Sequence, residues 1–238
     1  MPTSTERRAL AAAERFLAAA RAALAARVAP DGSVDAAALD THQFAAHGFA
    51  WMATGVAGLR ALLDWRDASA GDGASGARDA AIAGLGAAEL LLQLGTGIAM
   101  SQGETARPAD LGLGAEAAAL LADPAVATLV AGATPAARER LAATLDDDIL
   151  APGHGDAETD AMARTLRRFA ADKVAPRARD WHRDDSLVPL DVIAGIASLG
   201  VFGLTVPEEY GGLGLGKTAM CASTEAVSYT HLTLPTKA

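Results

Sequence analysis

Residues 201–218, VFGLTVPEEYGGLGLGKT, decide which of two folds the chain can have. The spacing Gly-x-x-x-x-Gly-Lys-Thr over residues 211–218 matches the phosphate-binding P-loop of nucleotide hydrolases. A P-loop requires a parallel β-sheet, because a buried strand leads into its first glycine and a helix follows its lysine. The competing interpretation is a glycine-rich turn between two packed elements of a helical protein.

The residues before the first glycine argue against a P-loop. The apolar run 201–206 does not reach that glycine, because residues 207–210, PEEY, stand between them. Two carboxylates beside the loop would also repel a polyphosphate. No apolar strand ending in a Mg²⁺-binding aspartate follows Thr218. We therefore expect a turn with a helix beginning near Lys217, and a nucleotide-binding protein stays as an alternative hypothesis.

The composition favours a helical protein throughout. Of 238 residues, 51% are hydrophobic but only 4% are aromatic, and the apolar residues are dominated by Ala and Leu, the strongest helix formers. Val, Ile and Thr form no alternating runs, so the predicted fold class is all-α. A net charge of −9 argues against nucleic-acid and anionic-membrane partners. With neither a secretory signal nor an apolar run of about 18 residues, we expect a cytoplasmic location.

Residues 1–147 are predicted to form an N-terminal helical bundle. A capping box, Thr3 with Glu6, predicts the start of the first helix. Leu10, Leu17 and Leu24 then form an apolar stripe along it. Further helices are expected over residues 35–65, 77–94, 115–121 and 135–145. The side chains predicted to face inward from the helix over residues 35–65 are Phe44, Trp51, Val56, Leu59 and Leu63.

Residues 148–159 are predicted to be a linker, and residues 160–228 a second helical domain. The acids, proline and glycines from Asp146 to Asp160 mark the boundary. The second domain should open with an amphipathic helix that Pro176 ends, and Pro189 and Gly200 should bound another. The inward side chains of the opening helix are Met162, Leu166, Phe169 and Val174. Residues 229–238 differ in composition and look like an artefactual tail.

Residues 160–228 resemble the N-terminal helical domain of flavin-dependent acyl-CoA dehydrogenases. The most specific part of the resemblance is LGVFGLTVPEEYGGLGL, residues 199–215. Where that family continues with Ser-Glu-Glu-Leu, residues 224–227 read Thr-Glu-Ala-Val, so one acid is missing. Residues 97–104, GIAMSQGE, and 107–110, RPAD, resemble an added N-terminal segment found in longer family members.

The resemblance implies an FAD enzyme that oxidises an acyl-CoA thioester at its α and β carbons, with a branched dicarboxylic acyl-CoA as a candidate substrate. In such chemistry a carboxylate removes the α-proton while a hydride passes to flavin N5. It also implies an electron-transfer acceptor and a homo-oligomer in the complete protein. In the family, that base and most flavin contacts come from regions beyond residue 228. We therefore assign no catalytic, cofactor-binding or metal-binding residue, and expect residues 1–238 alone to be an inactive fragment.

The remaining polar residues give no stronger site. His42 and His47 are five apart, which does not place them on one helix face as metal ligands. We interpret His154 and Asp146–Asp148 as parts of a solvated linker, and Cys221 as packed rather than reactive. Gln102, Glu104 and Arg107 form a polar loop that could contact a ligand or a partner domain. A stand-alone helical interaction protein is the other alternative.

Overall fold

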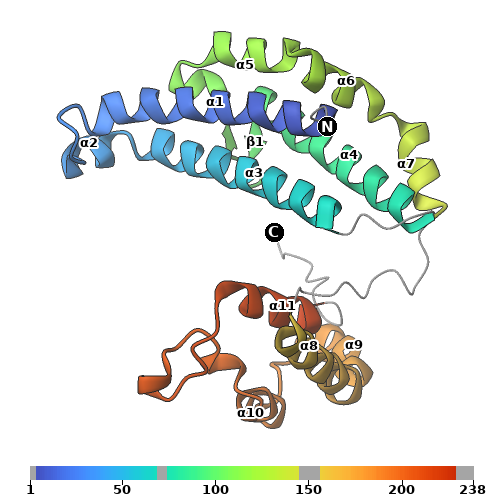
Figure 1. Ribbon diagram of the computed structural model, residues 1–238. Coiled ribbons are helices and arrows are strands. Elements are labelled where there is room, and N and C mark those ends of the chain that lie inside the picture. The colour runs from blue at the N-terminus through green and yellow to red at the C-terminus, as the bar shows by residue number, and fades with distance from the viewer. Residues whose placement is uncertain (1–3, 69–73, 145–155, 229–238) are drawn as a thin grey trace. The chain divides into compact units, whose positions relative to one another are not determined.

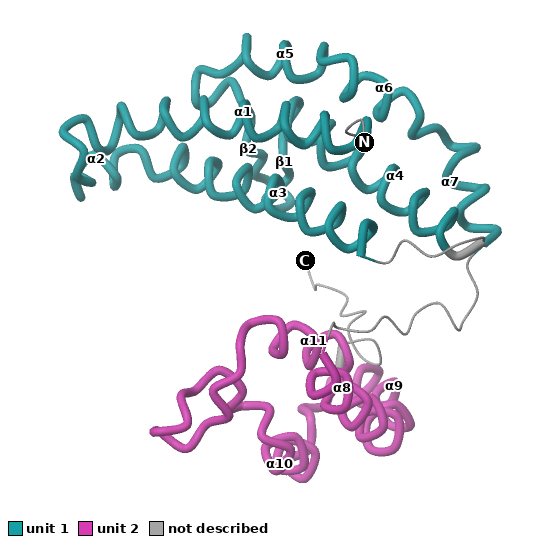
Figure 2. The backbone as a smooth tube through the Cα atoms, viewed as in Figure 1, with its two compact units in different colours: residues 1–146 teal, residues 147–238 magenta. Residues whose placement is uncertain are grey.

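The computed structural model describes residues 4–68, 74–144 and 156–228. The chain divides into two compact units, residues 1–146 and residues 147–238, coloured separately in Figure 2. Helices dominate both units, and the sheet found among the described residues has two strands of two residues each. The all-α prediction is confirmed. Each unit is described below by itself.

The first unit is a helical bundle built on three long helices (Figure 1). Helix α1 packs against α3, α3 packs against α4, and α5 and α6 cover α1 and α4. Their buried side chains form one continuous apolar cluster. The elements are α1 (Thr5–Val28), α2 (Ala36–Thr41), α3 (Gln43–Ala68), α4 (Ala74–Thr96), β1 (Ile98–Ala99), β2 (Thr105–Ala106), η1 (Pro108–Leu111), α5 (Gly114–Ala122), α6 (Pro124–Gly132) and α7 (Pro135–Ala142).

The first helix begins at a different cap from the predicted one. Ser4 is the N-cap of α1, and its hydroxyl accepts a hydrogen bond from the Arg7 amide at 3.2 Å. Thr3, the predicted cap, lies outside the described residues. The predicted stripe is present, because Leu10 is buried and Leu17 and Leu24 pack against the same core.

The predicted helix over residues 35–65 is two helices, α2 and α3, separated at His42. Asp35 caps the first of them, accepting a hydrogen bond from the Ala38 amide at 2.6 Å. Three predicted inward residues of α3, Val56, Leu59 and Leu63, are buried. The other two are exposed, which corrects the prediction. Phe44 keeps 47% of its surface accessible and Trp51 keeps 37%.

Helix α6 was not predicted from the sequence, although the sequence contains a signal for it. Its signal is Asp123 followed by Pro124, an N-cap followed by proline at the first helical position. The Asp123 carboxylate accepts a hydrogen bond from the Ala125 amide at 3.0 Å.

Among the described helices, none is long and apolar enough on its own to cross a membrane. The pair α5 and α6 meets the length and composition test only as a unit bent by 71°.

The second unit is held together by α8 packing against α11. Its buried cluster consists of Ala163, Leu166 and Ala226. Helix α10 begins after Pro189 and ends before Gly200, as predicted. The elements are α8 (Ala157–Phe169), the π-helical turn η3 (Ala170–Val174), α9 (Ala175–Arg183), α10 (Leu190–Ser198), η4 (Val201–Gly203), η5 (Glu208–Tyr210) and α11 (Lys217–Ser228).

Pro176 does not end the helix before it, contrary to the prediction. The chain widens into the π-helical turn η3 and then continues as α9, with Pro176 in the first turn of that helix. Proline cannot donate a backbone hydrogen bond and its ring crowds the preceding carbonyl, so a wider turn lets the helix pass it. The predicted linker residues 148–155 lie outside the described residues, and α8 already begins at Ala157.

Candidate functional site

The glycine-rich loop, residues 203–216, has a geometry that excludes a P-loop. Its backbone folds back on the segment before it, and its amides donate to carbonyls of that segment. The Gly214 amide bonds the Val206 carbonyl at 2.8 Å, and the Leu215 amide bonds the Leu204 carbonyl at 2.7 Å. The amides of residues 211–213 are likewise bonded to carbonyls of Glu208, Pro207 and Gly203. A phosphate cradle needs these amides free, so the nucleotide-binding alternative is wrong for this loop.

Close backbone packing explains why residue 212 of this loop is a glycine. A Cβ atom at Gly212 would lie 2.1 Å from the carbonyl oxygen of Val206, which real side chains do not allow. Gly211 has a φ of +80°, the left-handed conformation that lets the chain reverse after η5. The predicted turn is therefore confirmed, and α11 starts at Lys217 as expected.

The polar loop of the first unit is a β-hairpin, in which the carbonyl of Glu104 accepts the Met100 amide at 2.9 Å. Gln102, Glu104 and Arg107 belong to this region. The Arg107 amide donates to the Asp110 carboxylate at 2.9 Å, which caps η1. Arg27 of α1 donates to the carbonyl of Leu111 at 2.7 Å and so fixes the end of η1. Residues 107–110 thus have a clear structural role, whereas Gln102 and Glu104 are exposed.

The histidines and the cysteine form no site in the described part of the chain. His47 accepts a hydrogen bond on Nε2 from the Trp51 indole N–H at 3.0 Å, one turn further along α3. No group of three or more potential metal ligands occurs among the described residues. Cys221 is exposed, which corrects its predicted packing. His154 and Asp146–Asp148 lie outside the described residues.

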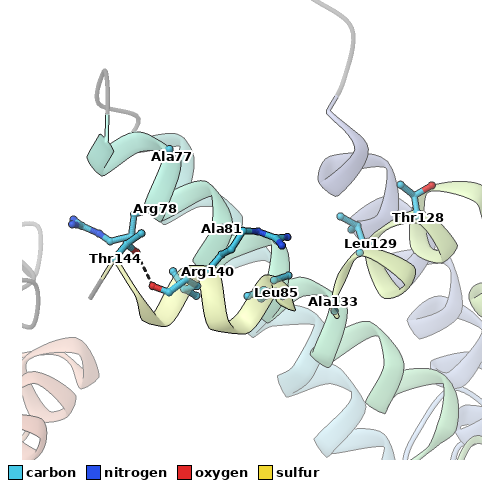
Figure 3. Close-up of a pocket in the computed structure, with 13 residues that line it drawn as sticks. Ala77, Arg78, Ala81, Leu85, Thr128, Leu129, Ala133, Arg140 and Thr144 are labelled. Carbon is cyan, nitrogen blue, oxygen red and sulfur yellow. Dashed lines mark hydrogen bonds between the residues drawn. The ribbon is translucent and has the colours of Figure 1, made fainter. Parts of the chain in front are cut away.

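Two cavities found among the described residues both belong to the first unit. The larger, about 610 Å³, lies between α4 on one side and α6 and α7 on the other (Figure 3). The apolar part of its wall includes Ala81 and Leu85 of α4 and Leu129 of α6. Positive charge is added to the lining by Arg78 and Arg140. Because its residues come from three separate helices, sequence periodicity gave no signal for it. The smaller, about 210 Å³, lies between α1 and α5.

In both units, local hydrogen bonds lower the pKa values of individual carboxyl groups. The pKa of Asp156 is lowered, because its carboxylate accepts the Thr159 amide at 2.7 Å as the N-cap of α8. The pKa of Asp67 is lowered by hydrogen bonds from Arg7 and then from Arg66. Burial raises the pKa of Glu6, but hydrogen bonds from its backbone and Ser4 and the charge of Arg66 leave it lowered overall.

Comparison with known sequences relates the second unit to a described family. Residues 156–236 match the family described as Acyl-CoA dehydrogenase, N-terminal domain. The loop of residues 203–216 lies within this match. Residues 156–236 of this chain are therefore similar to the N-terminal part of an acyl-CoA dehydrogenase.

A particular relative extends the similarity into the first unit. The chain is 41% identical over 227 residues to a (2S)-methylsuccinyl-CoA dehydrogenase of Cereibacter sphaeroides. The aligned region includes 92% of this chain and 40% of that relative. The chain thus spans less than half the length of the relative that it matches.

The described residues do not by themselves fit the FAD that the family implies. In the second unit, the amides of residues 211–215 are already bonded to the protein's own carbonyls and offer nothing to a diphosphate. The larger cavity is in the first unit, and its lining is mostly apolar. We therefore assign no flavin contact to the described side chains.

Proposed function

We propose that this chain is part of an FAD-dependent dehydrogenase that oxidises an acyl-CoA thioester between its α and β carbons, with methylsuccinyl-CoA as the substrate. The proposed substrate rests on how much of the chain is similar in sequence to the methylsuccinyl-CoA dehydrogenase. The family match covers residues 156–236, whereas the alignment to the methylsuccinyl-CoA dehydrogenase covers 92% of the chain and so includes most of the helical bundle of residues 1–146.

The structure supports a positioning role for this part of the protein rather than a chemical one. Asp110 and Asp156 cap helices, and Asp67 is a partner of arginines. A general base must lie within hydrogen-bond reach of the carbon acid that it deprotonates, in a shielded site. We propose that the base and the flavin site lie outside the described residues.

The test uses a protein of the relative's full length that carries these residues. We expect it to be purified with bound flavin, whose absorbance near 450 nm is bleached anaerobically by (2S)-methylsuccinyl-CoA. Butyryl-CoA is the control, because it is an acyl-CoA that lacks the second carboxylate and the branch. Bleaching by butyryl-CoA but not by methylsuccinyl-CoA would refute the proposed substrate. A protein without flavin, or with flavin that neither thioester bleaches, would refute the proposed reaction.

The chain of 238 residues provides a second measurement. We propose that it binds neither FAD nor acyl-CoA stoichiometrically without the rest of the protein. Titration calorimetry with FAD, and then with methylsuccinyl-CoA, checks this. A dissociation constant in the low micromolar range for FAD would show that these residues hold a flavin site after all. An electron-transfer acceptor and a homo-oligomeric complete protein are further parts of the proposal.

A further inference from the structure

Helix α10 is attached to the second unit by few apolar contacts. Of its side chains, Val192 is buried, whereas Leu190 and Ile193 are 80% and 39% exposed. Its backbone comes close to α8 at one point, because a Cβ atom at Gly195 would lie 2.7 Å from Cε2 of the Phe169 ring. Apolar packing therefore fixes α10 over a short stretch around Val192 and Gly195.

The chain turns sharply on both sides of α10. Asp185, between α9 and α10, has a φ of +51°, and Gly200, just after α10, has a φ of +78°. Both angles belong to the left-handed region, which ends a helix rather than extending it. Because neither connection continues α10 as a helix, the direction of α10 depends on the contacts that its side chains make.

Arg177 of α9 provides such a contact and makes two others. Its Nε and Nη2 atoms donate to the carbonyl of Lys173 in the π-helical turn η3, at 3.4 and 3.2 Å. Its guanidinium carbon lies 4.8 Å from the centre of the Trp181 ring, within the range of a cation–π interaction. Its Nη2 atom lies 3.7 Å from Oδ2 of Asp191 in the first turn of α10. One side chain thus contacts η3, α9 and α10, and we call these three contacts the Arg177 clamp.

The place of Arg177 next to Pro176 explains the first contact. Proline has no backbone N–H, so Pro176 removes a donor from the widened turn that precedes it. The guanidinium of the next residue supplies donors to a carbonyl of that turn. Arginine can do this and still contact a carboxylate and an aromatic face, because its planar group has five N–H donors. Lysine has the charge but not the planar fork.

The other acids of α9 and of the turn after it do not compete for Arg177. Asp180 and Asp184 both pair with Arg183, at 3.1 and 3.0 Å. Asp191 belongs to a different helix, so its pairing with Arg177 joins two elements rather than two neighbours on one helix. A carboxylate in the first turn of a helix is also favoured by the helix dipole.

We infer that Arg177 is a positioning residue that holds α10 against α9, and that loss of the Arg177 clamp lets α10 open as one unit while α8 and α11 stay packed. The buried cluster of α8 and α11, Ala163, Leu166 and Ala226, contains no residue of α10, so it does not depend on the clamp. Exposed ion pairs and cation–π contacts are individually weak, so the opening is reversible. This inference does not rest on the proposed enzymatic function.

Tryptophan fluorescence tests the clamp directly. In the 238-residue chain with Trp51→Phe and Trp65→Phe, Trp181 is the sole tryptophan. Arg177→Ala should shift its emission to longer wavelength and increase acrylamide quenching about twofold, because the guanidinium no longer covers the ring. Arg177→Lys should restore part of the protection, since the charge remains. Arg179→Ala is the matched control, because Arg179 is exposed on roughly the opposite side of the same helix.

Hydrogen exchange followed by mass spectrometry tests the consequence for α10. We expect its amides to exchange at least about fivefold faster in Arg177→Ala, and by a smaller factor in Asp191→Asn, with the protection of α8 and α11 unchanged. Equal effects of Arg179→Ala and Arg177→Ala would overturn the inference. So would a Trp181 that is as accessible in the original chain as in Arg177→Ala, or a loss of protection in α8 and α11 together with α10.

Discussion

The two units differ in how completely their helices enclose a core. In the first unit, α1, α3, α4, α5 and α6 contribute to one buried cluster. In the second, the cluster is confined to α8 and α11, and α10 contributes one buried residue, Val192. Large apolar side chains of the second unit that remain exposed are Leu187, Val188, Leu190, Ile193, Phe202, Val206, Tyr210, Leu213 and Met220.

This difference shows that good local structure is not sufficient for a closed core. Helices of both units have proper caps, such as Ser4 for α1 and Asp156 for α8. A capping side chain bonds the free backbone amides in the first turn of one helix. Burial of that helix depends instead on the surfaces of the elements that surround it. The first unit supplies these surfaces itself. The second unit should therefore be the less stable of the two, which substitutions can test.

Truncation of a core leucine should have the largest effect on the free energy of unfolding, and it should show most clearly how the stabilities of the two units differ. Leu63 and Leu166 are both almost completely buried, at 0% and 1% exposed. Leu63→Ala and Leu166→Ala should each cost about 2–5 kcal/mol of the free energy of unfolding. We expect the first unit to remain folded and the second to open at 25 °C, because its cluster is smaller. Hydrogen exchange followed by mass spectrometry checks this, and protection of α8 and α11 that survives Leu166→Ala would contradict it.

A methyl group at Gly212 should disturb the second unit through the loop of residues 203–216. Gly212→Ala would place its Cβ against the Val206 carbonyl, so we expect a loss of about 1–3 kcal/mol. Gly216→Ala is the matched control, since no atom lies within 4 Å of its Cβ position. Chemical denaturation followed by hydrogen exchange in α11 measures both. Equal effects of the two substitutions would show that close packing of Gly212 against the Val206 segment is unimportant.

The stability of the first unit should depend modestly on pH through the ionisation of Asp67. Hydrogen bonds from Arg7 and Arg66 hold its pKa below the ordinary value of 3.8. A lowered folded pKa stabilises the fold above the unfolded pKa, and this contribution is lost as pH falls through the folded pKa. Asp67→Asn should cost less than about 1 kcal/mol at pH 7, because the pair is exposed.

At a pH below the folded pKa of Asp67, the same substitution should have a smaller effect. Urea unfolding at pH 7 and at the lowest pH at which the chain stays folded compares the two conditions, and high salt should reduce the effect at pH 7. Asp31→Asn, in the turn after α1, is the control for a general loss of negative charge. A penalty for Asp67→Asn that is equal at both pH values would contradict the ion-pair explanation.

The smallest expected effect is that of Lys217→Ala on nucleotide binding. Because the amides of residues 211–215 are bonded within the protein, we expect neither the original chain nor the variant to bind ATP or GTP. Equilibrium dialysis with labelled nucleotide is a direct measurement. Binding by the original chain that disappears in Lys217→Ala would restore the P-loop hypothesis.

Local sequence signals predicted the helices and the loop correctly where one short segment contains all the information. Pro189 and Gly200 bound α10, because proline and glycine act through their own backbone conformation. The loop of residues 203–216 could be predicted as a turn because PEEY separates the apolar run from the first glycine. Helix α6 also has a local signal, the N-cap Asp123 followed by Pro124.

Predictions about which side chains face the core were less successful. Phe44 and Trp51 are apolar and were expected inside, yet the residues that immediately follow them, Ala45 and Met52, are the buried ones. A helix with apolar residues on more than one side does not indicate which side the neighbouring helices cover. The cavity between α4, α6 and α7 could not be predicted either, because its lining residues are far apart in sequence.

The sequence by itself determined the helical class, the approximate extent of several helices and the resemblance of residues 160–228 to acyl-CoA dehydrogenases, because these depend on residues that are close along the chain. Only the tertiary structure decided that the loop amides are occupied, that Phe44 and Trp51 are exposed, and that the second unit leaves apolar residues uncovered. Hydrogen-bond partners and burial are properties of surfaces brought together from distant segments. They therefore become visible only when those segments are placed side by side.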